Sequence, residues 1–484
     1  MNIISGCIMS QIRTIFKNFS WVTVSQVITN LCAFVWTILI ARYLGVTNYG
    51  ILSFVIALTT FIGLGTDMGM TVYTTRELSR NILNTLKFVN NVIPLKIFLS
   101  VILCICSLII VYAFGYPRLV CVLTFIMFLE YSLISMFGFV NGVFQAHEEL
   151  RPGSIGQIIY SISLVLLTLL VTYFDLGIIA VAISYAFAYL ICLVYASYFL
   201  VRTYGKPKFE IDFTFWKNIT NKSLPFGLTS IFYIIYFSID TVMLSILSGN
   251  YATGLYNSAY KVISVFTAFY VIYQYVIFPL MSKLYAEDTN LLKVSFQQSF
   301  KYSLLILLPI IIGVYFYAPY LIDLIYTNQF ALAAGPMKIL IWTVVFLFIN
   351  GVATSLLNSI GKEFSVTKIY IVAAVFNIIL NFFAIPVWSY MGASAATVLS
   401  EILIMALMMR EISRTEYSPD WSLLKNVVKV VICGIILAIV LYVINVSLWL
   451  AIPIGLVVYL ASLYLTGTID DTDRFIINEI LNRN

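Results

Sequence analysis

The chain has 484 residues, of which 62% are hydrophobic and only 10% carry a charge, and its formal net charge is +6. Because soluble domains contain about 25% charged residues, this composition excludes a soluble protein and indicates a polytopic membrane protein. The net positive charge does not indicate a nucleic-acid partner, since in a membrane protein the placement of basic residues matters more than their sum. The seven cysteines are odd in number and lack CxxC spacing, which is typical of small core residues.

Apolar runs of about 20 residues recur along the whole chain, and each can cross about 30 Å of hydrocarbon as a helix. The expected fold is an all-α polytopic integral membrane protein with about 14 transmembrane helices. Arg13 and Lys17 precede the first run, and no small-residue cleavage pattern follows it, which predicts a retained first span. The predicted spans are residues 20–41, 49–73, 89–112, 118–141, 154–174, 178–201, 223–247, 254–281, 302–326, 336–359, 365–388, 391–410, 427–445 and 449–466.

Basic residues distinguish the two sides of this predicted map. With the N-terminus in the cytoplasm, all but five of the 27 lysines and arginines fall in the inner segments. The five others are Arg42, Arg118 and Lys338 in outer segments and Lys96 and Lys261 inside spans. Since cytoplasmic loops carry an excess of Lys and Arg, this asymmetry predicts that both termini are cytoplasmic.

The stretch from Ser223 to Lys261 joins two apolar runs through a turn between Gly249 and Gly254. At about 1.5 Å per residue, Asp240 and Lys261 both lie roughly 10 to 14 Å below this turn, so they are predicted to face one another across adjacent helices. An ionisable side chain in hydrocarbon costs several kcal/mol unless it meets a partner or water. The two residues are therefore candidates for a cavity, with Lys261 binding the substrate and Asp240 carrying a coupling cation or relaying charge. Alternatively they are a neutralised pair that lets the hairpin insert.

The chain shows signs of an internal repeat, because Gly45 and Gly50 reproduce the spacing of Gly249 and Gly254. We expect two like-oriented copies of a six-helix lobe that enclose a central cavity and rock against each other. The other matching pairs, in chain order, are Lys87-Phe88 with Pro94 and Lys301-Tyr302 with Pro309, Gln145-Ala146 and Asn358-Ser359, and residues 177–180 and 392–395. The expected divisions are an N-terminal lobe (1–201), a basic cytoplasmic connector (202–222), a C-terminal lobe (223–410), and two extra C-terminal helices with a cytoplasmic tail (411–484).

Several motifs resemble one known family. They are ARYLGVTNYGILSF from residue 41, TDMGMTVYTTRELSR from residue 66, SIDTVML from residue 238, and the connectors FQAHEE and LNSIGKE. From about residue 15 to 466 the chain is similar to the Wzx-type O-antigen and oligosaccharide-lipid flippases. These belong to the polysaccharide-transporter branch of the multidrug/oligosaccharidyl-lipid/polysaccharide (MOP) superfamily.

This resemblance implies a flippase that moves an undecaprenyl-pyrophosphate-linked oligosaccharide from the cytoplasmic to the periplasmic leaflet of the bacterial inner membrane. It implies no catalysis and no cofactor. The implied partners are membrane lipids, a polysaccharide polymerase and chain-length proteins, with H⁺ or Na⁺ as a coupling ion. Where the family carries cationic residues in the N-terminal half of the cavity, this chain offers Lys96, Arg42 and Arg76.

Other ionisable residues inside spans have two possible roles each. Glu130 lies roughly 18 Å into a 30 Å core, where it either takes part in proton coupling or makes a structural hydrogen bond between helices. Lys96, about 10 Å from the cytoplasmic end of its span, either attracts a lipid pyrophosphate or extends to the inner headgroups. Asp67, just before Gly69, is a gate or a helix-packing turn, and Glu401 is a weaker candidate for charge relay.

Two other functions remain open from the sequence. The first is a multidrug or small-solute exporter of the same architecture, driven by Na⁺ or H⁺. The second is a polymerase or ligase of the same pathway, which would need catalytic groups on the outer face. The outer loops are short and pair no base with a nucleophile, and no P-loop is present. With His147 as the only histidine, no metal site is expected.

Overall fold

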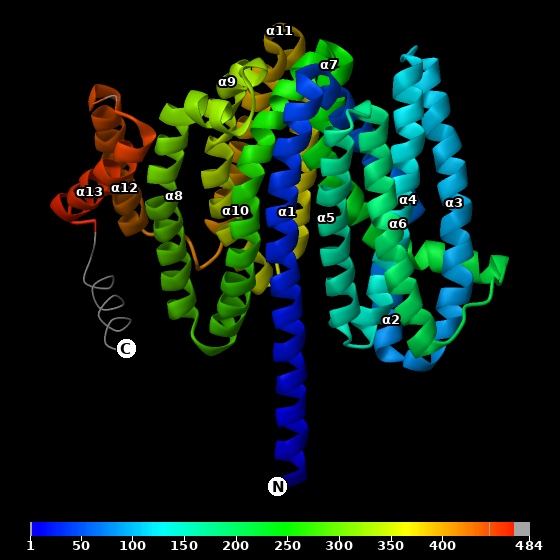
Figure 1. Ribbon diagram of the computed structural model, residues 1–484. Coiled ribbons are helices and arrows are strands. Elements are labelled where there is room, and N and C mark those ends of the chain that lie inside the picture. The colour runs from blue at the N-terminus through cyan, green and yellow to red at the C-terminus, as the bar shows by residue number, and fades with distance from the viewer. Residues whose placement is uncertain (1, 445, 469–484) are drawn as a thin grey trace. The chain divides into compact units, whose positions relative to one another are not determined.

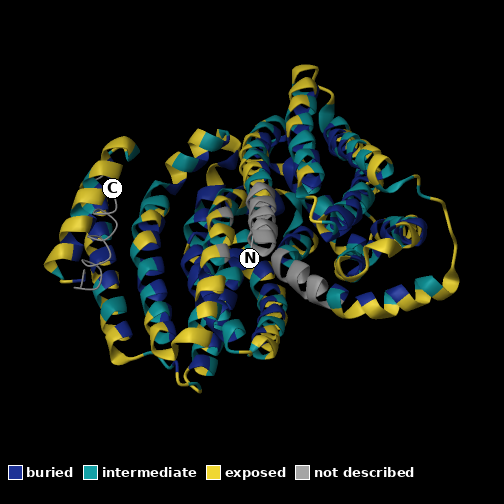
Figure 2. Cartoon of the chain, turned by 90° about the horizontal axis from the view of Figure 1, so that it is seen from below, coloured by how far each residue is buried: buried dark blue, intermediate teal, exposed yellow. Residues whose placement is uncertain are grey.

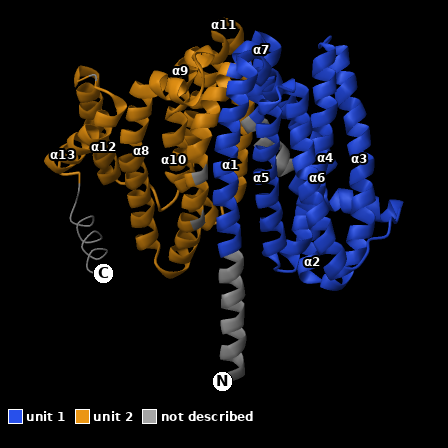
Figure 3. Ribbon diagram, in the orientation of Figure 1, with its two compact units in different colours: residues 1–254 blue, residues 255–484 orange. Residues whose placement is uncertain are grey.

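In the computed structural model of the chain, the backbone is described for residues 2–444 and 446–468, and the side chains for those ranges without 2–19, 228–237, 268 and 275. Every regular element within these residues is a helix, which confirms the predicted all-α membrane fold (Figure 1). The chain divides into two compact units, residues 1–254 and 255–484 (Figure 3). This boundary lies C-terminal to the predicted connector, and the division into two six-helix lobes stays a prediction.

Unit 1 contains α1 (Asn2–Gly63), η1 (Leu64–Thr66), α2 (Met70–Arg80), η2 (Ile82–Asn84), α3 (Thr85–Ala113), α4 (Arg118–Ala146), α5 (Leu150–Tyr173), α6 (Gly177–Tyr204) and the first part of α7 (Phe213–Glu287). Unit 2 contains the rest of α7, α8 (Thr289–Ile325), η3 (Asn328–Ala333), α9 (Ala334–Leu340), α10 (Trp342–Ser359), α11 (Glu363–Ile412), α12 (Trp421–Ile444) and α13 (Leu448–Leu465).

Eleven helical segments of the described chain are long and apolar enough to cross a membrane. Three of the helices each combine two of the predicted spans, on either side of one residue with non-helical torsion angles. These residues are Gly45 in α1, Gly249 in α7 and Ser389 in α11. The number of spans predicted from the sequence therefore agrees with the structure once the three breaks are counted. The predicted span 49–73 is longer than its helix, because α1 ends at Gly63.

The outward faces of these helices are apolar. On α3, for example, Ile97, Val101 and Ile105 follow one another at four-residue spacing and are 42%, 55% and 53% exposed. Exposed residues, in yellow, recur along the helices of both units (Figure 2). In water such a stripe would destabilise the fold, whereas against lipid tails it costs nothing. The distribution of exposed side chains is that of a protein surrounded by hydrocarbon.

The two glycine motifs found in the sequence adopt the same backbone conformation. Gly45 has φ 67° and ψ 174°, and Gly249 has φ 84° and ψ 174°. This left-handed region is open to glycine at little cost, so glycine is the residue that allows each helix to break there. The matching torsion angles support the sequence repeat in its N-terminal part.

Gly50 and Gly254 make reciprocal close contacts within unit 1. A Cβ atom on Gly50 would lie 1.8 Å from the carbonyl oxygen of Asn250, and one on Gly254 would lie 2.1 Å from that of Val46. Val46 and Asn250 occupy the same position after the break in each motif. The two breaks therefore pack against each other backbone to backbone, with no room for a side chain.

Two prolines at matching positions of the repeat each free a carbonyl group. Pro94 in α3 has no N–H for the carbonyl oxygen of Asn90, which instead accepts a hydrogen bond from Glu210 N at 3.2 Å. Pro309 in α8 leaves the carbonyl oxygen of Leu305, which accepts from the Tyr459 hydroxyl at 3.0 Å. Each freed carbonyl thus binds a segment that lies outside the predicted six-helix repeat.

We expect Gly50→Ala and Gly254→Ala to lower the thermal unfolding temperature of the detergent-purified protein. Each methyl group would force two backbones apart, at a free-energy cost of about 1 to 3 kcal/mol. Gly138→Ala in α4 is the matched control, because a Cβ there meets no atom within 4 Å. Variants at all three positions with the same unfolding temperature would contradict the close backbone contact.

Candidate functional site

The helical chain breaks after η1, and the Asp67 carboxylate lies at this break. Between η1 and α2, Met68 and Gly69 have φ angles of 43° and 78°, so the helix cannot continue. Asp67 precedes them and accepts hydrogen bonds from Thr71 N at 3.2 Å and from the Thr71 hydroxyl. The carboxylate thereby occupies the first turn of α2, where unpaired N–H groups favour negative charge.

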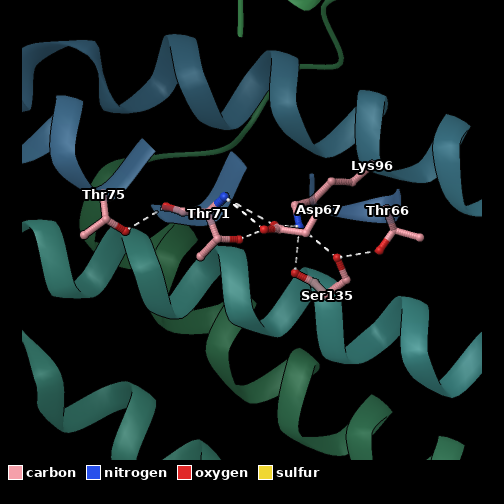
Figure 4. A network of polar contacts seen from close by, with 6 residues as sticks. All are labelled: Thr66, Asp67, Thr71, Thr75, Lys96 and Ser135. Carbon is pink, nitrogen blue, oxygen red and sulfur yellow. Dashed lines mark hydrogen bonds and ion pairs between the residues drawn. The ribbon is translucent and has the colours of Figure 1, made fainter. Parts of the chain in front are cut away.

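Lys96 reaches this carboxylate from α3. Its Nζ lies 2.5 Å from Asp67 Oδ1 and also donates to Ser135 Oγ at 2.8 Å and to the Ser135 carbonyl oxygen at 3.1 Å (Figure 4). The Thr66 hydroxyl donates to Ser135 Oγ at 3.0 Å. Three donor positions of the ammonium group therefore have acceptors, which an ion removed from water requires.

The two partners differ in exposure. The side chain of Lys96 is 0% exposed, whereas that of Asp67 is 30% exposed. A ligand approaching this site would therefore meet the carboxylate first, with the ammonium group behind it. The sequence assigned Lys96 to the substrate and Asp67 to a gate as separate hypotheses, and the structure joins them in one charge network.

Glu130 in α4 is a second buried carboxyl group of unit 1. It is 6% exposed, and Tyr131, Tyr160, Tyr185 and Tyr189 lie near it. Tyr160 and Tyr189 stack with ring centroids 3.8 Å apart. Among the described side chains no basic residue pairs with Glu130, and none forms a hydrogen bond with it. A group in this setting can bind a proton or a cation that offsets the lost hydration of its charge.

The predicted arginines are exposed. Arg76 in α2 lies over the rings of Tyr73 and Phe226 at 5.5 and 5.2 Å and pairs with Glu77 at 3.2 Å. Arg42 lies in α1, three residues before the Gly45 break, and is also exposed. Contact of either residue with an anionic headgroup stays a prediction.

The remaining predicted residues belong to different units. Asp240 is buried in unit 1, whereas Lys261 is exposed in unit 2, so their predicted pairing stays a prediction. Glu401, also in unit 2, is 6% exposed and accepts a hydrogen bond from Asn350 Nδ2 at 2.7 Å. Glu401 therefore takes part in a hydrogen bond that joins α10 and α11.

Sequence reasoning missed three sets of residues at these sites. Nothing marks Ser135 as the main acceptor for Lys96, because an isolated serine in an apolar run has many possible roles. The tyrosines around Glu130 are hidden among 33 tyrosines of the chain. Asn350 lies far from Glu401 in the sequence, and a signal for that pair would require knowledge of how α10 and α11 pack.

Comparison with known proteins identifies relatives along most of the chain. The model of the family described as "Polysaccharide biosynthesis protein" matches residues 15–285, and the MatE model matches residues 225–383. The uncharacterized membrane protein MJ1068 of Methanocaldococcus jannaschii is 23% identical over 423 residues, which covers 81% of this chain and 82% of that protein. A second such protein, MJ1375, is 25% identical over 411 residues, or 80% and 95% of the two chains.

Solved structures share the fold. Lipid II flippase MurJ in an inward closed conformation has a TM-score of 0.74 at 16% identity, covering 91% of this chain and 97% of that one. A multidrug resistance MATE family transporter of the MOP superfamily has a TM-score of 0.62 at 15% identity, covering 80% and 94%. These matches support the superfamily that the motifs resemble, and the Wzx-type branch stays a prediction.

We expect Lys96→Met to destabilise the protein by about 3 kcal/mol, because it leaves the Asp67 carboxylate beside an apolar side chain. The double variant Asp67→Asn/Lys96→Met should recover about 1 to 3 kcal/mol of that loss, since neither charge then remains. Thermal unfolding of the four proteins in detergent measures this cycle. Additive effects of the two substitutions would show that the pair is not coupled.

The family model covers more than half of the 484 residues, and the helices it covers carry the Asp67 and Lys96 network as well as the two glycine breaks. The chain therefore belongs to the polysaccharide biosynthesis protein family, and it has the fold of the MOP-superfamily transporters.

Proposed function

We propose that the protein is a flippase for an undecaprenyl-pyrophosphate-linked oligosaccharide, which it moves from the cytoplasmic to the periplasmic leaflet by alternating access. It would lie in the bacterial inner membrane with both termini in the cytoplasm. The flipped oligosaccharide would then pass to a polymerase and to chain-length proteins. Membership of a polysaccharide biosynthesis family and the fold shared with a lipid II flippase support this proposal.

Lys261 is the residue that favours an anionic lipid-linked substrate. Lys261 lies in the membrane-spanning part of α7 and is exposed, and its ammonium group has no acceptor among the described side chains. An uncompensated positive charge at this depth is costly unless it meets water or an anion. A pyrophosphate group would supply the missing negative charge, as a point charge that lysine binds well.

In the proposed cycle, the substrate headgroup enters a cytoplasm-facing cavity, the lobes rock, and the sugar leaves on the other side while the lipid tail stays in the bilayer. Arg76 and Lys261 would attract the pyrophosphate, and Arg42, which is predicted on the outer side, would contact it after the lobes rock. Lys96 would bind the pyrophosphate only in a state in which the chain moves at the break between η1 and α2 and withdraws Asp67 from Lys96. The close contact at Gly50 and Gly254 is made chiefly by backbone atoms, and we propose that it separates in each cycle.

We expect Lys261→Gln to reduce translocation about 10- to 100-fold, because a hydrogen bond to a charged group contributes about 1.5 to 3 kcal/mol. Lys261→Arg should keep most of the activity. The measurement follows a fluorescent undecaprenyl-pyrophosphate oligosaccharide across proteoliposome membranes. Lys283→Gln is the matched control, since this lysine is exposed near the end of the same helix. Unchanged translocation by Lys261→Gln at equal protein levels would contradict the assigned role.

Deletion of the gene in its host tests the function itself. A flippase-deficient strain should accumulate lipid-linked repeat units on the cytoplasmic leaflet, whereas loss of a polymerase or ligase would trap them on the outer leaflet. The MatE match favours a cation-coupled exporter as the second candidate. That function predicts sensitivity to drugs or solutes with unchanged surface polysaccharide.

We expect Glu130→Gln to make translocation insensitive to an imposed pH gradient if Glu130 carries the coupling proton, because the amide can neither bind nor release one. The assay compares proteoliposomes with and without the gradient. Glu363→Gln, which changes an exposed carboxylate, is the control. A gradient response of the Glu130→Gln protein equal to that of the wild type would assign the carboxyl group a structural role. Asp240 and Glu401 would then remain as candidates.

A further inference from the structure

The segment between α6 and α7 is held on α3 by backbone and side-chain hydrogen bonds. Lys208 N donates to Asn90 Oδ1 at 2.7 Å, and Glu210 N donates to the Asn90 carbonyl oxygen freed by Pro94. The Glu210 carboxylate accepts from Asn90 Nδ2 at 2.8 Å and from Asn91 Nδ2 at 3.3 Å. The backbone of both residues and the side chain of Glu210 are therefore bound to α3, whereas the side chain of Lys208 is exposed.

The start of α7 is fixed to the same place. Trp216 Nε1 donates to the Asn91 carbonyl oxygen at 3.0 Å, and the ring of Phe215 packs edge-on against Phe88 at 5.3 Å. Ile219 in the next turn is buried. One side of this first part of α7 thus packs on unit 1, and the orientation of the whole segment is set.

The large apolar residues between these contacts are exposed. Phe209, Ile211 and Phe213 are 74%, 65% and 73% exposed, and we call them the connector ridge. The ring of Phe213 also contacts that of Trp216, with centroids 5.4 Å apart. They alternate with the two residues that bind α3, and they lie outside the candidate membrane spans. Three adjacent large apolar side chains on a surface outside the spans indicate a binding partner.

Lysines flank the connector ridge in the sequence. Lys206, Lys208, Lys217 and Lys222 are exposed, and their ammonium groups have no acidic partner among the described residues. The two acidic residues nearby already accept hydrogen bonds from other groups. Glu210 binds α3, and Asp212 caps α7 by accepting from Thr214 N at 2.9 Å and Phe215 N at 3.1 Å.

We propose that the connector ridge and its four lysines bind the bilayer surface through anionic phospholipid headgroups. The apolar side chains would insert at the boundary between headgroups and acyl chains, and the lysines would contact the phosphates above them. This arrangement matches the charge and apolarity of the segment, since anionic lipid attracts basic residues next to a membrane. It does not depend on which substrate the protein transports.

Site-specific fluorescence tests the depth of the connector ridge. In the full-length protein with its native cysteines replaced by alanine, an environment-sensitive label is placed at position 209 or 211, or at exposed Asn290 as a control. Bilayers contain phosphatidylcholine alone or with phosphatidylglycerol. We expect the labels at 209 and 211 to be quenched by headgroup-proximal spin-labelled lipid and shielded from aqueous iodide, more strongly with phosphatidylglycerol, and the label at 290 to behave in the opposite way. Iodide quenching at 209 and 211 equal to that at 290 would overturn the proposal.

A lipid-binding measurement tests the charges. Native mass spectrometry of the full-length protein compares retained phosphatidylglycerol with phosphatidylcholine at low salt. Each lysine near an anionic surface contributes about 1 kcal/mol, so Lys217→Gln/Lys222→Gln should lower the preference for phosphatidylglycerol about 30-fold. The control Lys283→Gln/Lys425→Gln removes two exposed lysines elsewhere and should have little effect. An equal preference in both variants, or none in the wild type, would overturn the assignment to anionic lipid.

Discussion

The ion pair between Asp67 and Lys96 shows the constraint on which the rest of the structure depends: in hydrocarbon, an ionised side chain needs a partner. Lys96 satisfies it with three acceptors and becomes fully buried. Glu401 has its bond from Asn350. Glu130 and Lys261 remain without such partners among the described residues, and for this reason we propose a mobile ion or a substrate as their complement.

Backbone features determine where these charges lie. The break before α2 turns the chain so that Asp67 meets Lys96, and it depends on two successive residues with positive φ angles. The breaks at Gly45 and Gly249 likewise bring two motifs into reciprocal contact. Glycine thus contributes twice, by permitting the torsion angles and by leaving space for a neighbouring backbone.

Much of the fold follows from the sequence, because long apolar runs, basic loops and glycines at turns are local signals. They predict the all-helical class and identify Gly45 and Gly249 as break points. The arrangement of the candidate site was harder to predict from the sequence. Asp67 lies at the break before α2 and Lys96 lies in α3. Their contact depends on the rotation of α3 about its axis, to which the flanking apolar residues give little guidance. Ser135 is a still weaker signal, since its role exists only in that packing.

The prolines of α3 and α8 show how a helix can offer an attachment point on its side. Each removes one internal hydrogen bond from its helix, and the vacant carbonyl group is then filled by Glu210 in one case and by Tyr459 of α13 in the other. In a regular helix the internal carbonyl groups are already bonded along the helix, so a neighbouring segment can attach only through side chains. A missing amide proton gives the backbone itself a lateral bond, and in this molecule that happens at Pro94 and at Pro309.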